Sequence, residues 1–155
     1  MKTLVLGLGN DILADDAVGI LAARALKADL AGIADVVETA EHGVALLDYF
    51  LGYDRAVLID AIQTGEHAPG TILDIDPNSL SAVYAPSPHY AGLPELIALA
   101  REMQLDFPRQ FRIFAVEVAD ARTLGGPMTP AVRRAVPALC ARVRAAVNAT
   151  APPLD

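Results

Sequence analysis

Two kinds of apolar pattern alternate along the chain. Short and almost continuous apolar runs have the length and composition of buried strands. Longer stretches with apolar residues three or four positions apart indicate helices that bury one face. The predicted strands span residues 3–8, 34–38, 55–60, 71–75 and 111–118. The predicted helices span residues 15–26, 44–51, 93–103 and 130–147.

This order of elements predicts the fold class. Strands that alternate with helices form a mostly parallel sheet with helices on both faces, because each helix carries the chain back for the next parallel strand. No repeat or composition shift divides the chain, so we expect one domain over residues 1–155, with a frayed tail at about 150–155. Residues 76–88 read as a polar loop, and Pro137 as a kink or start within the last helix.

Composition narrows the class of protein. The 155 residues are 54% hydrophobic and 20% charged, which suits one globular core. A formal net charge of −7 argues against nucleic-acid binding, which relies on basic side chains. No apolar run approaches the roughly 20 residues of a membrane helix, and the start of the chain does not read as a signal peptide. The single Cys140 excludes an internal disulfide. We therefore expect a cytoplasmic protein.

Three polar side chains are placed where a parallel sheet carries its sites. Ligands bind beyond the carboxyl ends of the strands. Asp16 opens the helix after the first predicted strand, Asp60 ends the third, and His89 lies in the loop before the 93–103 helix. Two carboxylates and one imidazole suit a divalent transition metal and leave coordination positions open. Taken singly, each residue has a simpler explanation, since Asp16 suits a helix N-cap, Asp60 a turn cap and His89 a solvated loop. Their spacing alone does not establish that they converge.

Other chemistries have weaker support. Gly7-Leu8-Gly9 follows a strand as in a dinucleotide fingerprint, but Ile12 stands where the third glycine belongs, and nearby aspartates would repel phosphate. The glycines instead predict a tight turn with close backbone approach. No Gly-x-Ser-x-Gly elbow, His-Glu-x-x-His zinc motif or phosphate-binding Lys-Ser/Thr pair is present in the sequence.

Several strings resemble the hydrogenase maturation endopeptidases, in the same order along nearly the whole chain. They are Gly7-Leu8-Gly9-Asn10, Asp15-Asp16-Ala17-Val18-Gly19, Leu58-Ile59-Asp60-Ala61, and Ser87-Pro88-His89 with Gly92-Leu93. The resemblance implies a three-layer α/β/α sandwich around a twisted sheet. It also implies that Asp16, Asp60 and His89 are the catalytic, metal-contacting residues, with Asp at position 16 where some members have Glu.

The resemblance further implies an activity and a partner. Such a protein is an endopeptidase that clips the C-terminus of a nickel-iron hydrogenase large-subunit precursor once nickel is installed. The nickel comes with the substrate, so no tightly bound cofactor of the protein's own is expected. We expect a monomer that binds neither nucleic acid nor membranes.

One segment departs from the family's pattern. Better-known members carry an Asp-Gly-Gly-Thr-like string after the second strand, which is thought to select the substrate. Here the segment is Glu38-Thr39-Ala40-Glu41-His42-Gly43, which keeps only the acidic start and the final glycine. Glu38, Glu41, His42 and Gly43 are therefore candidate substrate-recognition residues for a different hydrogenase. A solvated loop without a partner explains them equally well.

The sequence leaves the mechanism open. In one mechanism, the substrate's nickel docks on the three candidate ligands and places the scissile bond. In another, a metal held by the enzyme polarises the carbonyl and activates water. A protein of another class, a nickel-binding maturation chaperone without hydrolytic activity, would use the same three ligands.

Overall fold

The computed structural model describes residues 1–77 and 92–149. Within them, five strands form one sheet in the order β2-β1-β3-β5-β4. The strands are β1 (Thr3–Leu8), β2 (Asp35–Thr39), β3 (Arg55–Ile62), β4 (Ile72–Ile75) and β5 (Gln110–Glu117). The first, second, third and fifth strands run parallel, and β4 pairs antiparallel with β5 at one edge. The sheet is therefore mostly parallel, as the order of elements predicts.

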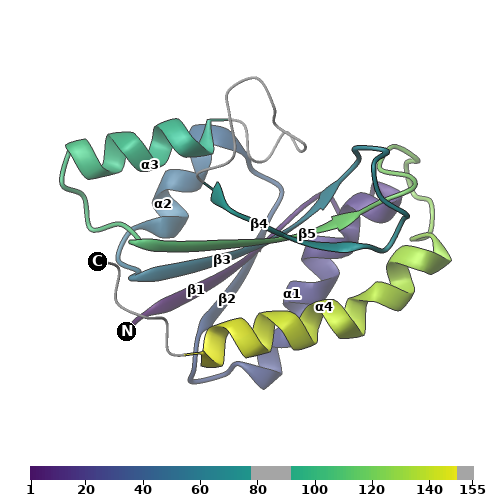
Figure 1. Ribbon diagram of the computed structural model, residues 1–155, viewed down its shortest axis with the longest axis horizontal. Helices are drawn as coiled ribbons and strands as arrows, with labels where there is room; N and C mark the ends of the chain where they lie inside the picture. Colours follow the sequence, from purple (N-terminus) through teal and green to yellow (C-terminus); the bar gives the residue numbers. More distant parts are fainter. Residues whose placement is uncertain (78–91, 150–155) are drawn as a thin grey trace.

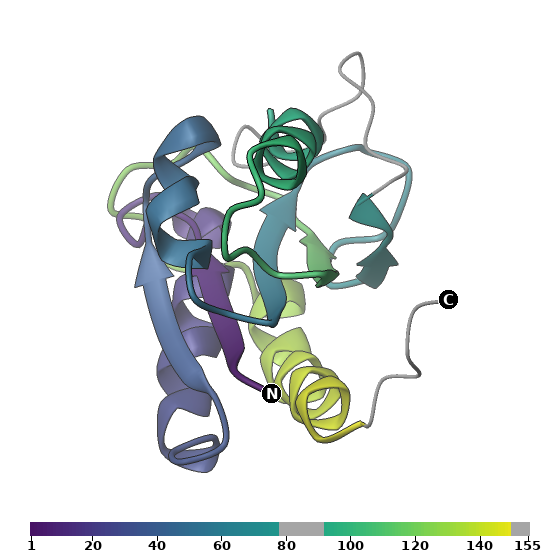
Figure 2. The ribbon, with the colours of Figure 1, turned by 90° about the vertical axis from the view of Figure 1, so that its left-hand side faces the viewer.

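Helices cover both faces of the sheet, so the molecule has three layers (Figures 1 and 2). One face carries α1 (Val18–Asp29) and α4 (Pro130–Asn148), which contact each other. The other face carries η2 (Gly43–Leu46), α2 (Leu47–Phe50) and α3 (Leu93–Glu102). A 3-10 turn, η1 (Ala14–Ala17), connects β1 to α1. The predicted α/β/α sandwich is confirmed.

Alternate side chains of the central strand β3 enter two separate cores. Its odd-numbered residues face α1 and α4, and its even-numbered residues face α2 and α3. The apolar members are Val57, Ile59 and Ala61 on the first face and Ala56, Leu58 and Ile62 on the second. Every residue of β3 is buried, as expected for a strand covered on both sides.

Some element bounds differ from the predictions. The strand predicted to end at Asp60 continues to Ile62, because parallel pairing with β5 extends through Asp60↔Ala115 to Ile62↔Glu117. The helix predicted over 44–51 consists only of the short η2 and α2. Helix α4 begins at Pro130 and passes through Pro137. The predicted loop beyond residue 77 and the predicted tail lie outside the described residues.

Helix α1 lies very close to the two central strands. A Cβ on Gly19, in the first turn of α1, would lie 2.2 Å from the carbonyl oxygen of Leu8 and 2.5 Å from that of Ile59. A Cβ on Gly7 would lie 2.4 Å from the carbonyl oxygen of Gly19. Ordinary Cβ contacts begin at 3.4 Å. These two glycines therefore allow the start of α1 to rest against the carboxyl ends of β1 and β3.

A buried arginine joins the end of α4 to the sheet. Arg55 is only 7% exposed and donates to the carbonyl oxygens of Ala146, Val147 and Ala149 at 2.5–3.1 Å. Its Nε also donates to Thr3 Oγ1 at 3.3 Å. Burial, together with the charge of a second arginine, lowers the pKa of Arg55. The carbonyls of a helix's last turn have no partner within the helix, so the guanidinium supplies their hydrogen-bond donors. Its positive charge also interacts favourably with the negative C-terminal end of the helix dipole.

Candidate functional site

The turn after β1 folds back over the end of that strand. A Cβ on Gly9 would lie 2.2 Å from the carbonyl oxygen of Asp16, so only glycine admits the η1 backbone at this point. Asp16 is half-buried, and its Oδ2 accepts a hydrogen bond from the backbone N–H of Asn10 at 2.9 Å. The side chain of Asn10 in turn accepts from the N–H of Ile12 at 3.2 Å. The close approach predicted for the glycines is thus made by the chain's own backbone.

Helix capping does not explain the aspartates of η1. Within residues 1–77, the N-cap of α1 is Ala17, and no side chain caps that helix. Asp15 is completely buried, and its carboxylate accepts hydrogen bonds from the segment after β5. Its Oδ2 accepts from the N–H groups of Ala119 at 3.0 Å and Asp120 at 2.9 Å. Its Oδ1 accepts from the N–H of Thr129 at 2.6 Å. Asp15 therefore connects η1 to the segment after β5 and does not cap a helix.

The second predicted ligand, Asp60, lies inside β3. Its side chain is completely buried, and Oδ1 accepts from the N–H of Ala61 at 2.7 Å. Because side chains alternate along a strand, Asp60 belongs to the face covered by α2 and α3. Burying a carboxylate is costly, so its place at the centre of the sheet marks it as more than a turn cap. The end-of-strand prediction is wrong by two residues, but the position near the carboxyl end holds.

The structure brings the Asp16 turn against the Asp60 strand. The 3-10 turn η1 contacts β3, and the start of α1 rests on the carbonyl of Ile59, the residue before Asp60. His89 lies outside the described residues. Among residues 1–77 and 92–149 there is no group of three or more His, Cys, Asp or Glu side chains suited to hold a metal. The role of all three predicted ligands stays a prediction.

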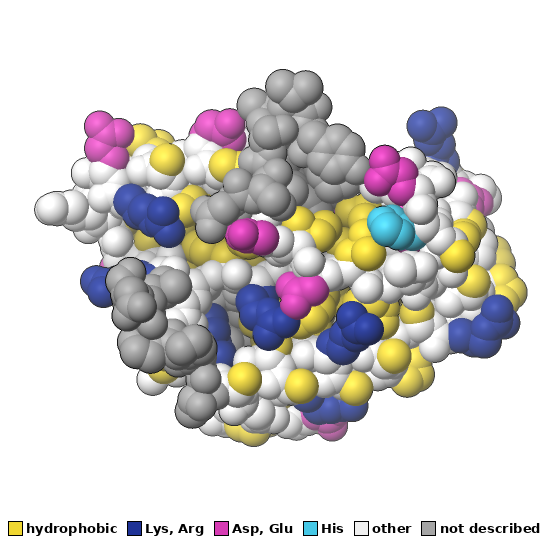
Figure 3. Space-filling view, viewed as in Figure 1, with side chains coloured by type: hydrophobic (Ala, Val, Ile, Leu, Met, Phe, Trp, Pro, Cys, Tyr) yellow, Lys and Arg dark blue, Asp and Glu magenta, His cyan; other side chains and the backbone are white. Residues whose placement is uncertain are grey.

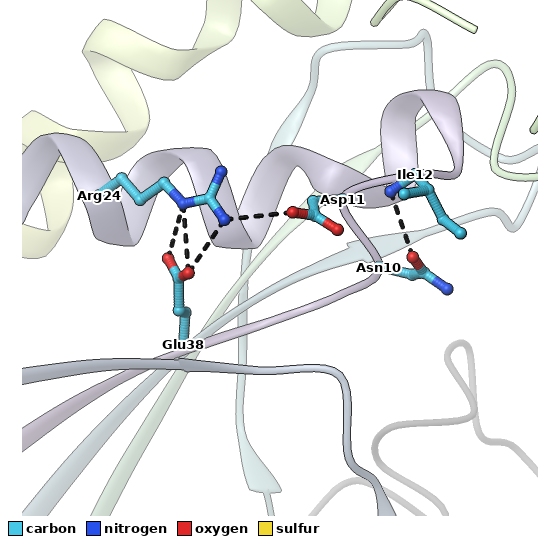
Figure 4. A network of polar contacts seen from close by, with 5 residues as sticks. All are labelled: Asn10, Asp11, Ile12, Arg24 and Glu38. Carbon is cyan, nitrogen blue, oxygen red and sulfur yellow. Dashed lines mark hydrogen bonds and ion pairs between the residues drawn. The ribbon is translucent and has the colours of Figure 1, made fainter. Parts of the chain in front are cut away.

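A three-residue ion network lies at the ends of β1 and β2 (Figure 4). The guanidinium of Arg24 donates to both carboxylate oxygens of Glu38 at 2.9 and 3.0 Å, and to Asp11 at 3.2 Å. The hydrogen bond that Arg24 donates to Glu38, and then the one it donates to Asp11, raises the pKa of Arg24. The groups are about half exposed, so the network fixes side-chain direction more than it stabilises the fold. Glu38 is thereby held beside the β1 turn.

The other predicted recognition residues follow in the turn between β2 and η2. Glu41 and His42 are exposed, and the N–H of Glu41 donates to Thr39 Oγ1 at 3.1 Å. Gly43 has a φ of +63° and begins η2. This segment is therefore an accessible turn at the same edge of the sheet. Its role in recognition is not tested by these contacts.

Two pockets flank this edge. A small one of about 190 Å³ is lined by Gly9, Asp11, Arg24, Glu38 and neighbouring residues, so it joins the β1 turn to the β2 end. A larger one of about 480 Å³ lies between α1 and the start of α4, and neither Asp16 nor Asp60 lines it. Asp16 and Asp60 do not line the smaller pocket either, so the candidate site is placed by the contact of η1 with β3 and not by a pocket. Size alone favours the larger pocket.

The surface chemistry is mixed. On the face in Figure 3, the described acidic and basic side chains are interspersed with apolar ones. No helix among the described residues is both long and apolar enough to cross a membrane.

Sequence reasoning missed two contributors. Arg24 lies on the exposed side of α1, and nothing in its local pattern predicts that it pairs with Glu38 of the next strand. The partners of Asp15 lie far along the chain, after β5. The Asp15-Asp16 pair was a visible signal, but only the fold shows that the two carboxylates point to different partners.

Comparisons with known proteins show the family and agree with the fold. The family described as hydrogenase maturation protease matches residues 20–146. The hydrogenase 2 maturation protease of Escherichia coli K12 is 29% identical over 120 residues, covering 75% of this chain and 73% of that protein. The hydrogenase expression/formation protein HupD of Rhizobium leguminosarum bv. viciae is 29% identical over 142 residues, covering 88% and 69%. The solved hydrogenase-maturating endopeptidase HybD from E. coli superposes with a TM-score of 0.74 at 28% identity, covering 95% and 92%.

Proposed function

Because this chain belongs to the hydrogenase maturation protease family, we propose that it removes a C-terminal extension from the nickel-loaded large-subunit precursor of a nickel-iron hydrogenase. The chain is an endopeptidase, as the family is. The nickel requirement and the position of the cut are the parts of the proposal that need a test of their own.

One observation carries the assignment of the site. The η1 turn that holds Asp16 contacts β3, and Gly19, at the start of the following α1, rests on the carbonyl oxygen of Ile59, the residue before Asp60. The elements that carry the two carboxylates thus contact each other near the carboxyl ends of β1 and β3. His89, which we place with them from the sequence, would add an imidazole nitrogen. This set of oxygen and nitrogen donors suits a divalent transition metal.

The ligand set also supports nickel as part of the substrate. Two carboxylates and one imidazole, with no thiolate, hold a divalent ion weakly compared with closed four-ligand zinc sites. A nickel ion already ligated in the precursor arrives with its own ligands. Its tether raises the effective concentration of ion and peptide together. The metal therefore acts as a recognition element that only the loaded precursor carries.

Docking of the nickel positions the peptide for hydrolysis. With the ion on Asp16, Asp60 and His89, the scissile bond is held at the carboxyl edge of the sheet, which lowers the entropic part of the barrier. A carboxylate not saturated by the ion, with Asp16 the most accessible, accepts a proton from water as the water attacks the carbonyl. Water adds across the amide bond, giving a new carboxyl terminus on the large subunit and a free amine on the released peptide.

The decisive experiment compares two forms of the precursor. Purified protein is incubated with nickel-loaded and with nickel-free large-subunit precursor, and mass spectrometry measures loss of the C-terminal peptide. We expect loss only from the loaded form, and little metal in the isolated protein by elemental analysis. Tight nickel transfer with no mass loss would make the protein a chaperone. Stoichiometric metal in the protein, with cleavage of nickel-free precursor, would establish an enzyme-owned metal instead.

Substitutions test the three ligands separately. Asp16→Ala, Asp60→Asn and His89→Ala should each abolish or strongly impair cleavage while circular dichroism still reports a folded protein, since each removes one ligand of the same ion. Asp48→Ala, at an exposed carboxylate on α2, is the matched control and should cleave normally. Normal processing by the His89 variant would remove that residue from the site.

Substrate selection is tested at the second strand. We propose that Glu38, oriented by Arg24 beside the small pocket, contacts the precursor together with the exposed Glu41 and His42 of the following turn. Glu38→Gln should raise KM with little change in kcat, because it weakens binding and leaves the metal ligands in place. An unchanged KM would leave this segment as a solvated turn.

A further inference from the structure

Asp15 is a buried carboxylate that the hydrolytic mechanism does not use. It lies in η1, one residue before Asp16, and is 0% exposed. Two backbone N–H groups donate to its Oδ2, from Ala119 and Asp120, and the N–H of Thr129 donates to its Oδ1. The hydroxyl of Thr129 also donates, at 2.8 Å from Oδ2. Within the described residues no cation contacts this carboxylate, so amides and one hydroxyl alone compensate its burial.

These bonds attach the β1 turn to residues 119–129, which connect β5 to α4. The N–H of Asp15 donates to the carbonyl of Asp120 at 2.8 Å, and the N–H of Gly125 donates to the carbonyl of Ile12 at 2.7 Å. Leu13 and Leu124 form an antiparallel bridge between the same segments. The turn is thus held from one side by the 119–129 connection and from the other by Gly9, which contacts the backbone of Asp16.

The turn is also strained, which shows that something must hold it. Ala14 has a φ of +39°, in the left-handed region that residues with a Cβ rarely adopt. Such conformations persist only where the surrounding structure determines them, and they concentrate at functional sites. The residue that follows Ala14 is the one with the bonds to the connection. Loss of those bonds would allow Ala14 to relax and the carboxylate of Asp16 to turn away.

We propose that Asp15 is a positioning residue for Asp16. It does not touch substrate, because it is buried; it fixes the η1 turn so that the carboxylate of Asp16 stays directed to the end of β1. The proposal rests on the proposed function, in which Asp16 contacts the precursor's nickel. Its chemical content is specific, since a carboxylate has acceptors on both oxygens and can serve the donors of Ala119, Asp120 and Thr129 at once.

The test replaces one acceptor oxygen without changing the size of the side chain. In Asp15→Asn, the amide NH₂ must face N–H donors on one side, so the attachment of the turn weakens. We expect kcat for the nickel-loaded precursor to fall about 10- to 100-fold, as for a misplaced reacting group. Thr129→Val removes only the hydroxyl donor and should lower kcat by a smaller factor. It replaces Asp15→Asn as the test variant if Asp15→Asn does not fold. Val143→Ala, in the α1 and α4 core away from the turn, is the control for lost stability.

A second readout does not depend on cleavage. The N–H of Asn10 donates to Asp16 Oδ2, so its hydrogen-exchange protection reports the direction of that carboxylate. Protection should fall in Asp15→Asn and stay unchanged in Val143→Ala. Adding Ala14→Gly to Asp15→Asn should restore part of kcat and of the protection, because glycine adopts the left-handed φ without strain.

The outcomes separate this proposal from the proposed function. If Asp16→Ala is inactive while Asp15→Asn matches Val143→Ala in kcat and in Asn10 protection, positioning by Asp15 is refuted and the protease assignment stands. A second outcome is that the Asn10 amide loses protection in Asp15→Asn while no variant of Asp16 changes cleavage. Asp15 then holds the turn as described, but Asp16 is not a site residue. That result refutes the proposal that Asp15 positions Asp16 for the reaction.

Discussion

Helix propensity and steric fit make opposite predictions for Gly19→Ala. Gly19 lies in the first turn of α1. By propensity alone, alanine in place of glycine inside a helix stabilises it by about 1 kcal/mol. The structure predicts the reverse, since the new Cβ would lie 2.2 Å from Leu8 O and 2.5 Å from Ile59 O. Both oxygens belong to the backbone of central strands, so no flexible side chain can move aside.

The magnitude follows from these two effects. To reach ordinary contact at 3.4 Å, the start of α1 must move about 1 Å from both strands or deform them. Overpacking of this kind costs typically 1–3 kcal/mol, and backbone neighbours place it near the upper end, at about 3 kcal/mol. The propensity gain of about 1 kcal/mol offsets part of this steric cost. The free energy of unfolding should therefore fall by about 2 kcal/mol. For a chain of this length the midpoint temperature should fall by roughly 4–8 °C.

Urea unfolding followed by circular dichroism measures this difference. Ala25→Gly, at an exposed position of the same helix, is the matched control and should lose about 1 kcal/mol through propensity alone. Because α1 carries η1 with it, the Gly19 variant should also cleave precursor more slowly while still folded. A Gly19→Ala protein as stable as the wild type, or more stable, would show that α1 does not rest on β1 and β3 as described.

Three further predictions concern groups outside the site. Arg55→Leu should lower the free energy of unfolding by about 2–4 kcal/mol in urea melts, since the buried carbonyls at the end of α4 lose their donor; a change under 0.5 kcal/mol would contradict this cap. Burial, with the hydrogen bond to Asp35, raises the pKa of Tyr53 from 10.0 to about 12, so its stabilising contribution is complete below pH 10 and is lost as the pH rises to about 12. Tyrosinate absorbance should therefore show a late step that disappears in Tyr53→Phe. Burial raises the pKa of the Cys140 thiol, so it should react with a disulfide reagent much more slowly in native protein than in urea, and equal rates would place it at the surface.

The sequence predicted the elements whose signal is local. Strand β1 was found within its observed bounds because an apolar run between polar residues needs no distant partner to be recognised. The antiparallel direction of β4 was not predicted, since its four residues pair with β5 only after the whole of α3 has intervened. Leu21 and Ala25 lie at helical spacing from the buried Val18, Ala22 and Leu26, yet both are exposed, because the fold and not the spacing decides which positions a neighbouring element covers.

The candidate site was predictable to a different degree. Asp16 and Asp60 were singled out by their place after strands, and the fold brings their elements into contact, but spacing alone contains no information on that contact. Their assignment as metal-contacting residues came from family resemblance. The role of Asp15 could not be predicted from the sequence, because its hydrogen-bond donors come after β5, more than 100 residues further along the chain. Long-range hydrogen bonds of this kind leave no periodic trace in a sequence.

The layer formed by α1 and α4 has a consequence for biosynthesis. Its apolar core combines residues 18–29 with residues 130–148, so the surface that α4 covers on α1 and β3 is open while most of the chain is being made. At typical translation rates of about 5–20 residues per second, the roughly 100 residues between the two helices take about 5–20 seconds to synthesise. During that time the nascent protein exposes Val5, Leu26 and Val57 to solvent or to a chaperone. The protease can therefore close its core only after residue 148 has left the ribosome, and its yield in the cell should depend on folding assistance more than its small size suggests.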